Sequence, residues 1–306
     1  PDGSPKDWYE ALAVADIQAA CDAFAPVYAD TDGGDGFVSL EVSPRLAHDT
    51  LATVDEARRL WARVDRPNVM IKVPATPEGL PAIETLIAEG INVNVTLMFS
   101  LAQYRAVCDA HLAGLRRRQA KKLPLNGVAS VASVFVSRID TLVDSLLDAA
   151  HKQGKLDAAR LKRVRGRLGI ANLKLAYQHY KATYRGPAFA ALADAGAAPQ
   201  RPLWASTSTK DPNYPDVMYV EALIGPETVN TLPRETLEAF RDHGRVAPTL
   251  ECDLDAARAA FEDVAACGVD VDAVMAQLLK EGVEKFVKPF DALLDSVAAK
   301  RRAVAA

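Results

Sequence analysis

The chain has 306 residues, 49% of them hydrophobic, and a formal net charge of −4, so it can bury a large core but lacks the positive field that attracts nucleic acid or an anionic membrane. No apolar run is long enough to cross a bilayer, and the start of the chain lacks the features of a signal peptide. Four widely separated cysteines, Cys21, Cys108, Cys252 and Cys267, are typical of reduced thiols in a cytoplasm.

Short β-branched runs alternate with longer stretches of helical spacing, which predicts βαβ units and a parallel sheet. The predicted strands are residues 37–42, 68–73, 91–96, 128–136 and 202–206, with a weaker candidate at 217–220 or 228–232. Five or six such strands fit a (β/α)8 TIM-type barrel that is short by about two strands. A flavodoxin-like open sheet, for which five or six parallel strands suffice, is the alternative.

The other elements are predicted to be helical and to belong to one domain, residues 1–306. Ser43-Pro44 and Thr76-Pro77 each place an N-cap residue before a proline, which marks a helix start. Residues 156–196 are predicted to be a helical excursion between the fourth and fifth strands. An apolar stripe predicts a C-terminal helix at 283–298 that packs on the barrel.

Lys72 lies inside the apolar run Val69–Val73 and is the first candidate for chemistry. Burial penalises the charged form of an amine, and a neutral lysine is a nucleophile toward carbonyls. Glu41, Asn94 and Thr96 occupy comparable places in neighbouring strands, so together they would supply a Schiff-base enzyme with a carboxylate, an amide and a hydroxyl. Alternatively, Lys72 is an edge residue whose stem lies on apolar neighbours.

Polar residues at the ends of the fourth and fifth strands predict an anion site. Arg138 offers a permanently charged fork suited to phosphate, and Ser133, Ser206 and Lys210 add donors. In a parallel α/β fold these strand ends lie on the active-site side. Alternatively, Arg138 pairs with Asp140 or another helix carboxylate, and the segment after the fifth strand is only a capping loop.

Metal and nucleotide chemistry are disfavoured. The five histidines, His48, His111, His151, His179 and His243, form no pair at ligand spacing beside a carboxylate. The glycine-rich Gly33–Gly36 precedes a strand and does not open a helix, so it is predicted to be a turn. We therefore expect no metal site and no phosphate-binding loop of the Walker type.

Five strand segments, in order, resemble the successive motifs of the transaldolase family. They are Val38-Ser39-Leu40-Glu41-Val42-Ser43-Pro44, Ile71-Lys72-Val73-Pro74-Ala75-Thr76, Gly90-Ile91-Asn92-Val93-Asn94-Val95-Thr96-Leu97, Ser133-Val134-Phe135-Val136-Ser137-Arg138-Ile139-Asp140 and Trp204-Ala205-Ser206-Thr207. The resemblance runs from about Trp8 to about Ala298. Thr209-Lys210-Asp211-Pro212 is similar to the longer bacterial form of the enzyme.

The resemblance implies a (β/α)8 enzyme of the pentose phosphate pathway that needs no cofactor. Such an enzyme moves a dihydroxyacetone unit from sedoheptulose 7-phosphate or fructose 6-phosphate to glyceraldehyde 3-phosphate or erythrose 4-phosphate. By this likeness Lys72 would form the Schiff base, while Glu41 and Thr96 would place the water of carbinolamine dehydration. A homo-oligomer, or a fusion to another sugar-phosphate enzyme, is compatible with the resemblance.

The same likeness assigns the remaining residues to substrate binding. Asn94 would bind sugar hydroxyls, Ser133 would lie beside the sugar, and Phe135 would shape the wall. Arg138, Ser206 and Lys210 would hold the phosphate. Lys210 replaces a family arginine, so its assignment is less secure than that of Arg138.

The front of the chain departs from the family pattern. Two family strands precede the helix that we expect to begin near Asp16. The first ends in an aspartate acting as general acid and base, and the second carries a Thr-Ser-Asn-Pro segment; neither motif occurs in residues 1–36, where Asp2, Asp7 and Asp16 lie in loop-like or helix-like sequence. We therefore expect an N-terminally shortened form that binds ketose phosphates but turns over poorly.

Two other functions remain open at this stage. A lysine-dependent (class I) aldolase would use the same covalent intermediate but release free dihydroxyacetone. A catalytically impaired barrel module would keep the surface without the chemistry, although the joint presence of Glu41, Lys72, Asn94, Thr96 and Arg138 argues against it.

Overall fold

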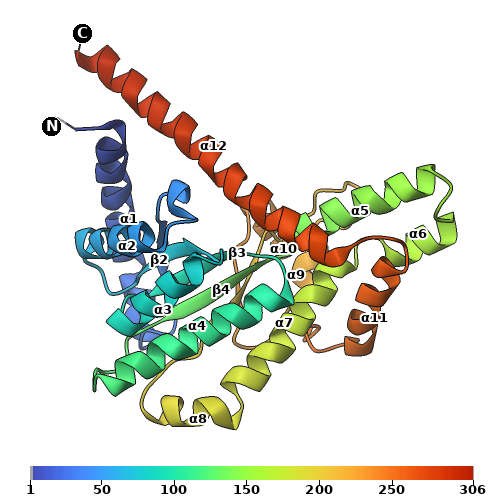
Figure 1. Cartoon of the computed structure of the whole chain (residues 1–306), viewed down its shortest axis with the longest axis horizontal. Coiled ribbons are helices and arrows are strands. Elements are labelled where there is room, and N and C mark those ends of the chain that lie inside the picture. Colours follow the sequence, from blue (N-terminus) through green and yellow to red (C-terminus); the bar gives the residue numbers. More distant parts are fainter. Residues whose placement is uncertain (1–2, 306) are drawn as a thin grey trace.

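The computed structural model of the chain describes residues 3–305 (Figure 1). Within these residues, six parallel strands form one curled sheet, a half-barrel, in the order β1-β2-β3-β4-β5-β6. The strands are β1 Val38–Glu41, β2 Val69–Pro74, β3 Val93–Met98, β4 Ser130–Phe135, β5 Arg201–Ala205 and β6 Val229–Asn230. Strictly sequential order is typical of a (β/α) barrel and contradicts a flavodoxin-like sheet, whose order reverses at a switch point.

The five main predicted strands are confirmed, with ends that shift by one or two residues. The weaker sixth strand lies within the candidate range 228–232, as β6. The other candidate range, 217–220, is wrong because Met218–Glu221 form the short helix α9. An apolar run of four residues cannot by itself distinguish a strand from a helical turn.

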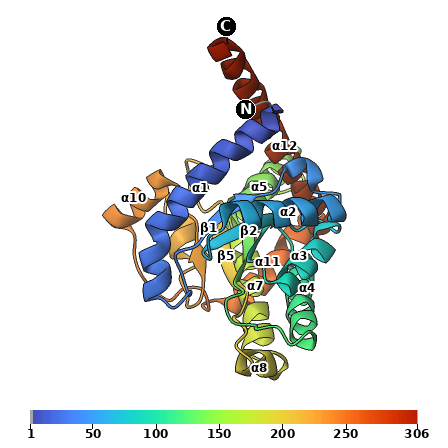
Figure 2. The ribbon, with the colours of Figure 1, turned by 90° about the vertical axis from the view of Figure 1, so that its left-hand side faces the viewer.

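Helices cover the sheet and connect its strands (Figures 1 and 2). Their bounds are α1 Pro5–Asp30, η1 Pro44–Leu46, α2 Thr50–Val64, α3 Gly79–Glu89, α4 Leu101–Ala120, α5 Ser137–Lys152, α6 Ala158–Val164, α7 Leu168–Tyr184, α8 Pro187–Asp194, α9 Met218–Glu221, α10 Arg234–His243, α11 Leu254–Ala265 and α12 Val271–Ala305. Helices α6, α7 and α8 fill the interval between β4 and β5 after α5. None of the described helices is both long and apolar enough to span a membrane.

Helix α1 begins eleven residues before the predicted start near Asp16, at Pro5. The Ser4 side chain accepts from the Asp7 amide, and the Asp7 carboxylate accepts in return from the Ser4 amide, which forms a capping box ahead of proline. Leu12 and Phe24 stay exposed on this helix, so its sequence has no clean apolar stripe from which its length could be predicted. Asp2, which the sequence places before it, lies outside the described residues.

Charged contacts fasten α1 to α2. Glu10 is buried and accepts from both Arg59 and Arg63, the latter at 2.8 Å. Lys6 pairs with Glu56, whose other oxygen accepts from the Ser43 amide at 2.6 Å just after β1. These contacts tie the first helix to the end of β1, where the candidate site begins.

Helix α12 crosses the carboxyl ends of β2 and β3 and is much longer than the predicted 283–298, because it runs from Val271 to Ala305. Gly282 lies so close to Leu97 that an added Cβ would come within 3.1 Å of its side chain. Farther along, Asp291 pairs with Arg45, and Phe290 packs edge-on against Tyr9 at 5.3 Å. Figures 1 and 2 show α12 continuing beyond the body of the molecule beside the start of α1.

Side chains point alternately to the two faces of the sheet, and each face belongs to its own hydrophobic core. Val69, Ile71 and Val73 of β2 belong to the core between the sheet and its outer helices. Met70 faces the concave side, where it packs in a second core with β4, β5 and α12 residues. Because side chains alternate along a strand, Lys72 points to the same concave side as Met70.

Candidate active site

The strand register brings three of the predicted residues to one level of the concave face. Glu41 on β1 lies opposite Lys72 on β2, and Lys72 lies opposite Asn94 on β3. Residues that are directly opposite on neighbouring strands have Cβ atoms close enough to interact on the shared face. A carboxylate, an amine and an amide therefore stand side by side near the carboxyl ends of the strands.

Lys72 is partly enclosed, with 25% of its side chain exposed. Its Nζ lies 3.7 Å from Glu41 Oε2 and 5.5 Å from the centre of the Phe286 ring of α12. Burial raises the pKa of Glu41, and the Lys72 ammonium opposes that rise. The amine is thus neither on an exposed edge nor fully buried: it sits between a carboxylate and an aromatic face at the rim of the sheet.

A hydrogen-bond chain fixes the amide of Asn94. Its Nδ2 donates to Ser39 Oγ at 2.9 Å, and its Oδ1 accepts from Ser133 Oγ at 2.8 Å. The two bonds have opposite polarity at the two ends of the amide and so determine its orientation. Asn94 and Ser133 are both buried, which joins β1, β3 and β4 beside Lys72.

Thr96 lies two residues beyond Asn94, on the same face of β3. It is fully buried, and its Oγ1 has no hydrogen-bond partner among the described residues. Most buried hydroxyls in proteins are paired, so this oxygen is available to a substrate or to a water molecule at the end of the strand.

Arg138 is a half-buried cation without a carboxylate partner among the described residues. Its guanidinium lies 4.9 Å from the centre of the Phe135 ring, and its Nη1 is buried without an acceptor. Burial lowers its pKa. The alternative partner Asp140 is engaged elsewhere, since it accepts from the Gly169 amide and the Tyr219 hydroxyl. Such an unpaired, stacked guanidinium is suited to a bidentate anion.

The two residues predicted from the fifth strand lie in different surroundings. Ser206 adopts a left-handed conformation with φ of 59°, and its Oγ lies 2.8 Å from Ser137 Oγ, one residue before Arg138. Lys210 is exposed, donates to Ser208 and lines a 230 Å³ cavity with Asp144 and Asp148. The structure therefore brings Ser206 toward Arg138, but it shows no contact between Lys210 and Arg138.

Several contacting residues were not predicted from the sequence. Ser39 accepts a hydrogen bond from Asn94. Because it lies two residues before Glu41 on the same strand, the sequence alone indicates that both side chains are on one face. Phe286 over Lys72 and Ser137 beside Ser206 had no such signal, because helix crossings and loop closures follow no local period. No group of three or more His, Cys, Asp or Glu within residues 3–305 is arranged to hold a metal ion.

Comparisons with known proteins identify the family of the chain. The profile of the family described as Transaldolase/Fructose-6-phosphate aldolase matches residues 2–297. A protein named Transaldolase from Thiobacillus denitrificans is 53% identical over 289 residues, which are 94% of this chain and 79% of that protein. One of the same name from Thermobifida fusca is 53% identical over 284 residues, 92% of this chain and 76% of its own. Transaldolase 2 from Nostoc sp. is 50% identical over 297 residues, 95% and 78% of the two chains.

Proposed function

Because this chain belongs to the transaldolase/fructose-6-phosphate aldolase family, we propose that its concave face carries out the transaldolase reaction. A dihydroxyacetone unit passes from a ketose phosphate to an aldose phosphate in the non-oxidative pentose phosphate pathway. The observation that carries the proposal is the row of Glu41, Lys72 and Asn94 in register on β1, β2 and β3. The four free thiols support a cytoplasmic location.

The first steps fall to Lys72 and its neighbours. The unprotonated Nζ adds to the C2 ketone of the donor, and the resulting carbinolamine loses water to give an iminium ion. Glu41, 3.7 Å from Nζ, and the unpaired Thr96 hydroxyl are placed to accept and return the protons and to hold that water. The Phe286 ring faces the cation that forms.

Carbon–carbon cleavage then uses the iminium as an electron sink. The bond between C3 and C4 breaks, its electron pair moves into the enamine, and the C4 hydroxyl gives its proton to the Glu41 carboxylate beside Lys72 as the aldose phosphate leaves. The retained three-carbon enamine adds to the carbonyl carbon of the acceptor aldehyde, whose oxygen takes the proton back from Glu41. Hydrolysis of the new iminium then frees Lys72. Asn94 is oriented to bind the sugar hydroxyls throughout.

The phosphate is bound at the far end of the site. The Arg138 guanidinium lies beside the Phe135 ring. The Ser206 hydroxyl is held near it by a hydrogen bond with the hydroxyl of Ser137, the residue before Arg138. Lys210 is a peripheral contributor, because its ammonium lies beside Ser208 and lines a cavity with Asp144 and Asp148. A loop movement would be needed to bring its ammonium to the phosphate.

We also propose that the curled sheet represents six consecutive strands of a (β/α)8 barrel. Its two edges are β1 and β6, and an eight-stranded barrel needs two further strands between them. One contact bridges the β5 and β1 sides of the sheet at the amino ends of the strands. Arg201, at the start of β5, donates to the backbone carbonyl of Gly34, which precedes β1, at 2.8 Å.

The test is transfer from fructose 6-phosphate with and without erythrose 4-phosphate. We expect glyceraldehyde 3-phosphate and sedoheptulose 7-phosphate to form slowly, and in equal amounts, when the acceptor is present. Lys72→Met, a substitution of similar length, should abolish both products. Release of free dihydroxyacetone at the same rate without the acceptor would contradict transfer and favour the aldolase reaction.

A further inference from the structure

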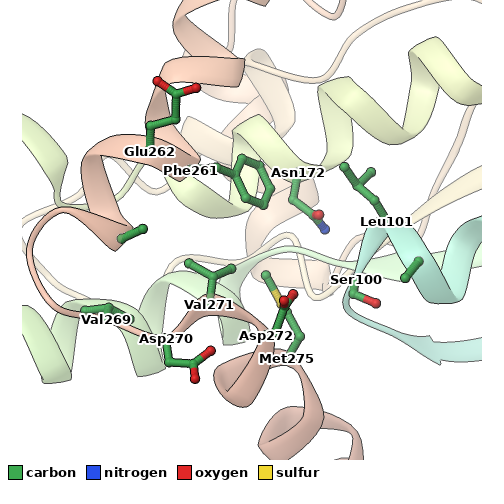
Figure 3. A pocket seen from close by; sticks show the side chains of 12 residues that line it. Ser100, Leu101, Asn172, Phe261, Glu262, Val269, Asp270, Val271, Asp272 and Met275 are labelled. Atoms are coloured by element: carbon green, nitrogen blue, oxygen red, sulfur yellow. The ribbon is translucent and has the colours of Figure 1, made fainter.

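A second cavity lies beyond the carboxyl end of β3, beside residues of the concave-side core such as Met275. It has a volume of about 530 Å³ and opens between the start of α4, α7 and the connection from α11 to α12 (Figure 3). Its walls are mainly apolar and include Leu101, Phe261, Val271 and Met275. Its lining contains none of the residues proposed above for catalysis or substrate binding. The volume falls within the range of pockets that take small organic molecules.

The inner wall of this cavity carries an unpaired acceptor. Asn172 of α7 is fully buried, and its Nδ2 donates to the Phe99 carbonyl at 2.8 Å. That bond fixes the amide orientation, so Oδ1 is the free end, and it is buried without a partner. Figure 3 shows Asn172 pointing into the cavity from the side opposite Asp272 and Met275.

An unsatisfied buried acceptor has a defined cost. Leaving such a group without a hydrogen bond forfeits the solvation it had in water, and buried side-chain oxygens are paired in most proteins. A donor on a bound molecule would recover this cost. The inner wall of the cavity therefore selects a ligand with an N–H or O–H group at its buried end.

The charge around the cavity is uniformly acidic. Glu262, Asp270 and Asp272 are exposed and line it, and no Lys, Arg or His does so. None of these three carboxylates forms an ion pair with a described residue; Asp270 caps α12 by accepting from the Ala273 amide. A phosphorylated sugar would thus meet like charges, whereas a cation would meet unpaired opposite ones.

We propose that this cavity binds an organic cation with an aromatic body and a second, buried donor. The ring lies between Phe261 and Met275, the ammonium faces Asp272, and the inner N–H donates to Asn172 Oδ1. The ligand class differs from the sugar phosphates of the concave face in both charge and polarity.

The experiment compares two probes of similar size by isothermal titration calorimetry. Tryptamine carries an indole N–H and an ammonium, and indole-3-acetate carries the same ring with a carboxylate. We expect tryptamine to bind with a dissociation constant on the order of 10⁻⁴ M and indole-3-acetate about tenfold more weakly. Equal affinity for the two probes, or no saturable binding of tryptamine, would overturn the proposal.

Two neighbouring alanines at the end of α11 provide a matched pair of variants. Ala265 lines the cavity and Ala266 does not, and both are exposed. Ala265→Trp should abolish tryptamine binding while Ala266→Trp retains it, with transfer activity kept in both as evidence of folding. Asp272→Asn should weaken binding about threefold, as expected for one exposed charge. Unchanged binding in Ala265→Trp would show that the probe sits elsewhere.

Discussion

Arg138 combines burial, a positive charge and the lack of a counterion. A cation in this situation destabilises the fold unless a ligand neutralises it. Its side chain rests on Phe135, so an apolar replacement of similar length would find the same packing surface. Function and stability should therefore respond in opposite directions when the charge is removed.

We expect Arg138→Met to raise the KM for fructose 6-phosphate about 100-fold, because a bidentate charge-assisted contact is worth about 3 kcal/mol. The free energy of unfolding should stay constant or rise by about 1 kcal/mol. Steady-state kinetics and urea unfolding measure the two quantities. Arg116→Met, on an exposed part of α4, is the control and should change neither. A lowered stability together with an unchanged KM would rule out the phosphate role.

Glu41 should set the acidic limit of activity. Burial raises its pKa, so the carboxyl remains protonated to a higher pH than an ordinary glutamate, whose pKa is about 4.3. If activity needs the Glu41 carboxylate, it should therefore fall, as the solution is acidified, before the pH reaches the pKa of an ordinary glutamate. In Glu41→Gln we expect a lower kcat and loss of this acidic limb from the profile of kcat/KM against pH. An unaltered limb in the variant would assign it to another group.

At the scale of elements, two buried carboxylates connect helices. Asp140 of α5 accepts from the Gly169 amide of α7 and the Tyr219 hydroxyl of α9. Burial raises the pKa of Asp140 to about 7, an effect that its hydrogen bonds partly oppose. Because this value exceeds that of an unfolded aspartate, about 3.9, the folded state binds more protons between the two values.

The stabilisation from Asp140 should thus be lost as the pH rises through 7. Between pH 6 and pH 8 the wild type should lose about 1 kcal/mol more unfolding free energy than Asp140→Asn, as measured by urea titration. Asp30→Asn, at the exposed end of α1, should behave as the wild type. The same pH dependence in Asp140→Asn and wild type would show that Asp140 is ionised throughout this range.

Glu10 makes the corresponding connection between α1 and α2. Burial would raise its pKa, but the hydrogen bond and charge of Arg59 outweigh burial and lower it. Glu10→Ala leaves Arg59 and Arg63 without their shared partner and should lower the free energy of unfolding by about 2 kcal/mol. The control is the exposed pair of Glu238 and Arg241. Glu238→Ala should change the free energy of unfolding by less than about 0.5 kcal/mol. Equal effects would show that the α1 contacts contribute no more than surface charges.

The elements that could be predicted are those with a strong local signal. Buried parallel strands are continuous β-branched runs, so β1 to β5 could be identified from residues such as Val69 and Ile71. The start of α1 was missed because its apolar residues lie on several sides of the helix. The path of α12 over Lys72 depends on distant contacts such as Asp291 with Arg45, which no local pattern contains.

At the scale of the whole molecule, the fold brings side chains from different strands together in one site. Sequential parallel strands bring their carboxyl ends to one edge, and the register sets Glu41, Lys72 and Asn94 at one level. Helix α12 covers that edge and supplies Phe286. The residues of the anion site follow on β4, at the start of α5 and after β5. The loop with Lys210 diverges, since a loop has no strand register to place it.

The account depends most on Lys72 as the nucleophile, and one measurement tests it directly. The protein is incubated with fructose 6-phosphate, reduced with borohydride, digested and examined by peptide mass spectrometry. We predict a three-carbon dihydroxypropyl adduct on the Nζ of Lys72, absent from Lys72→Met. An adduct on another lysine, such as Lys174 or Lys210, or no adduct in the wild type, would contradict the account.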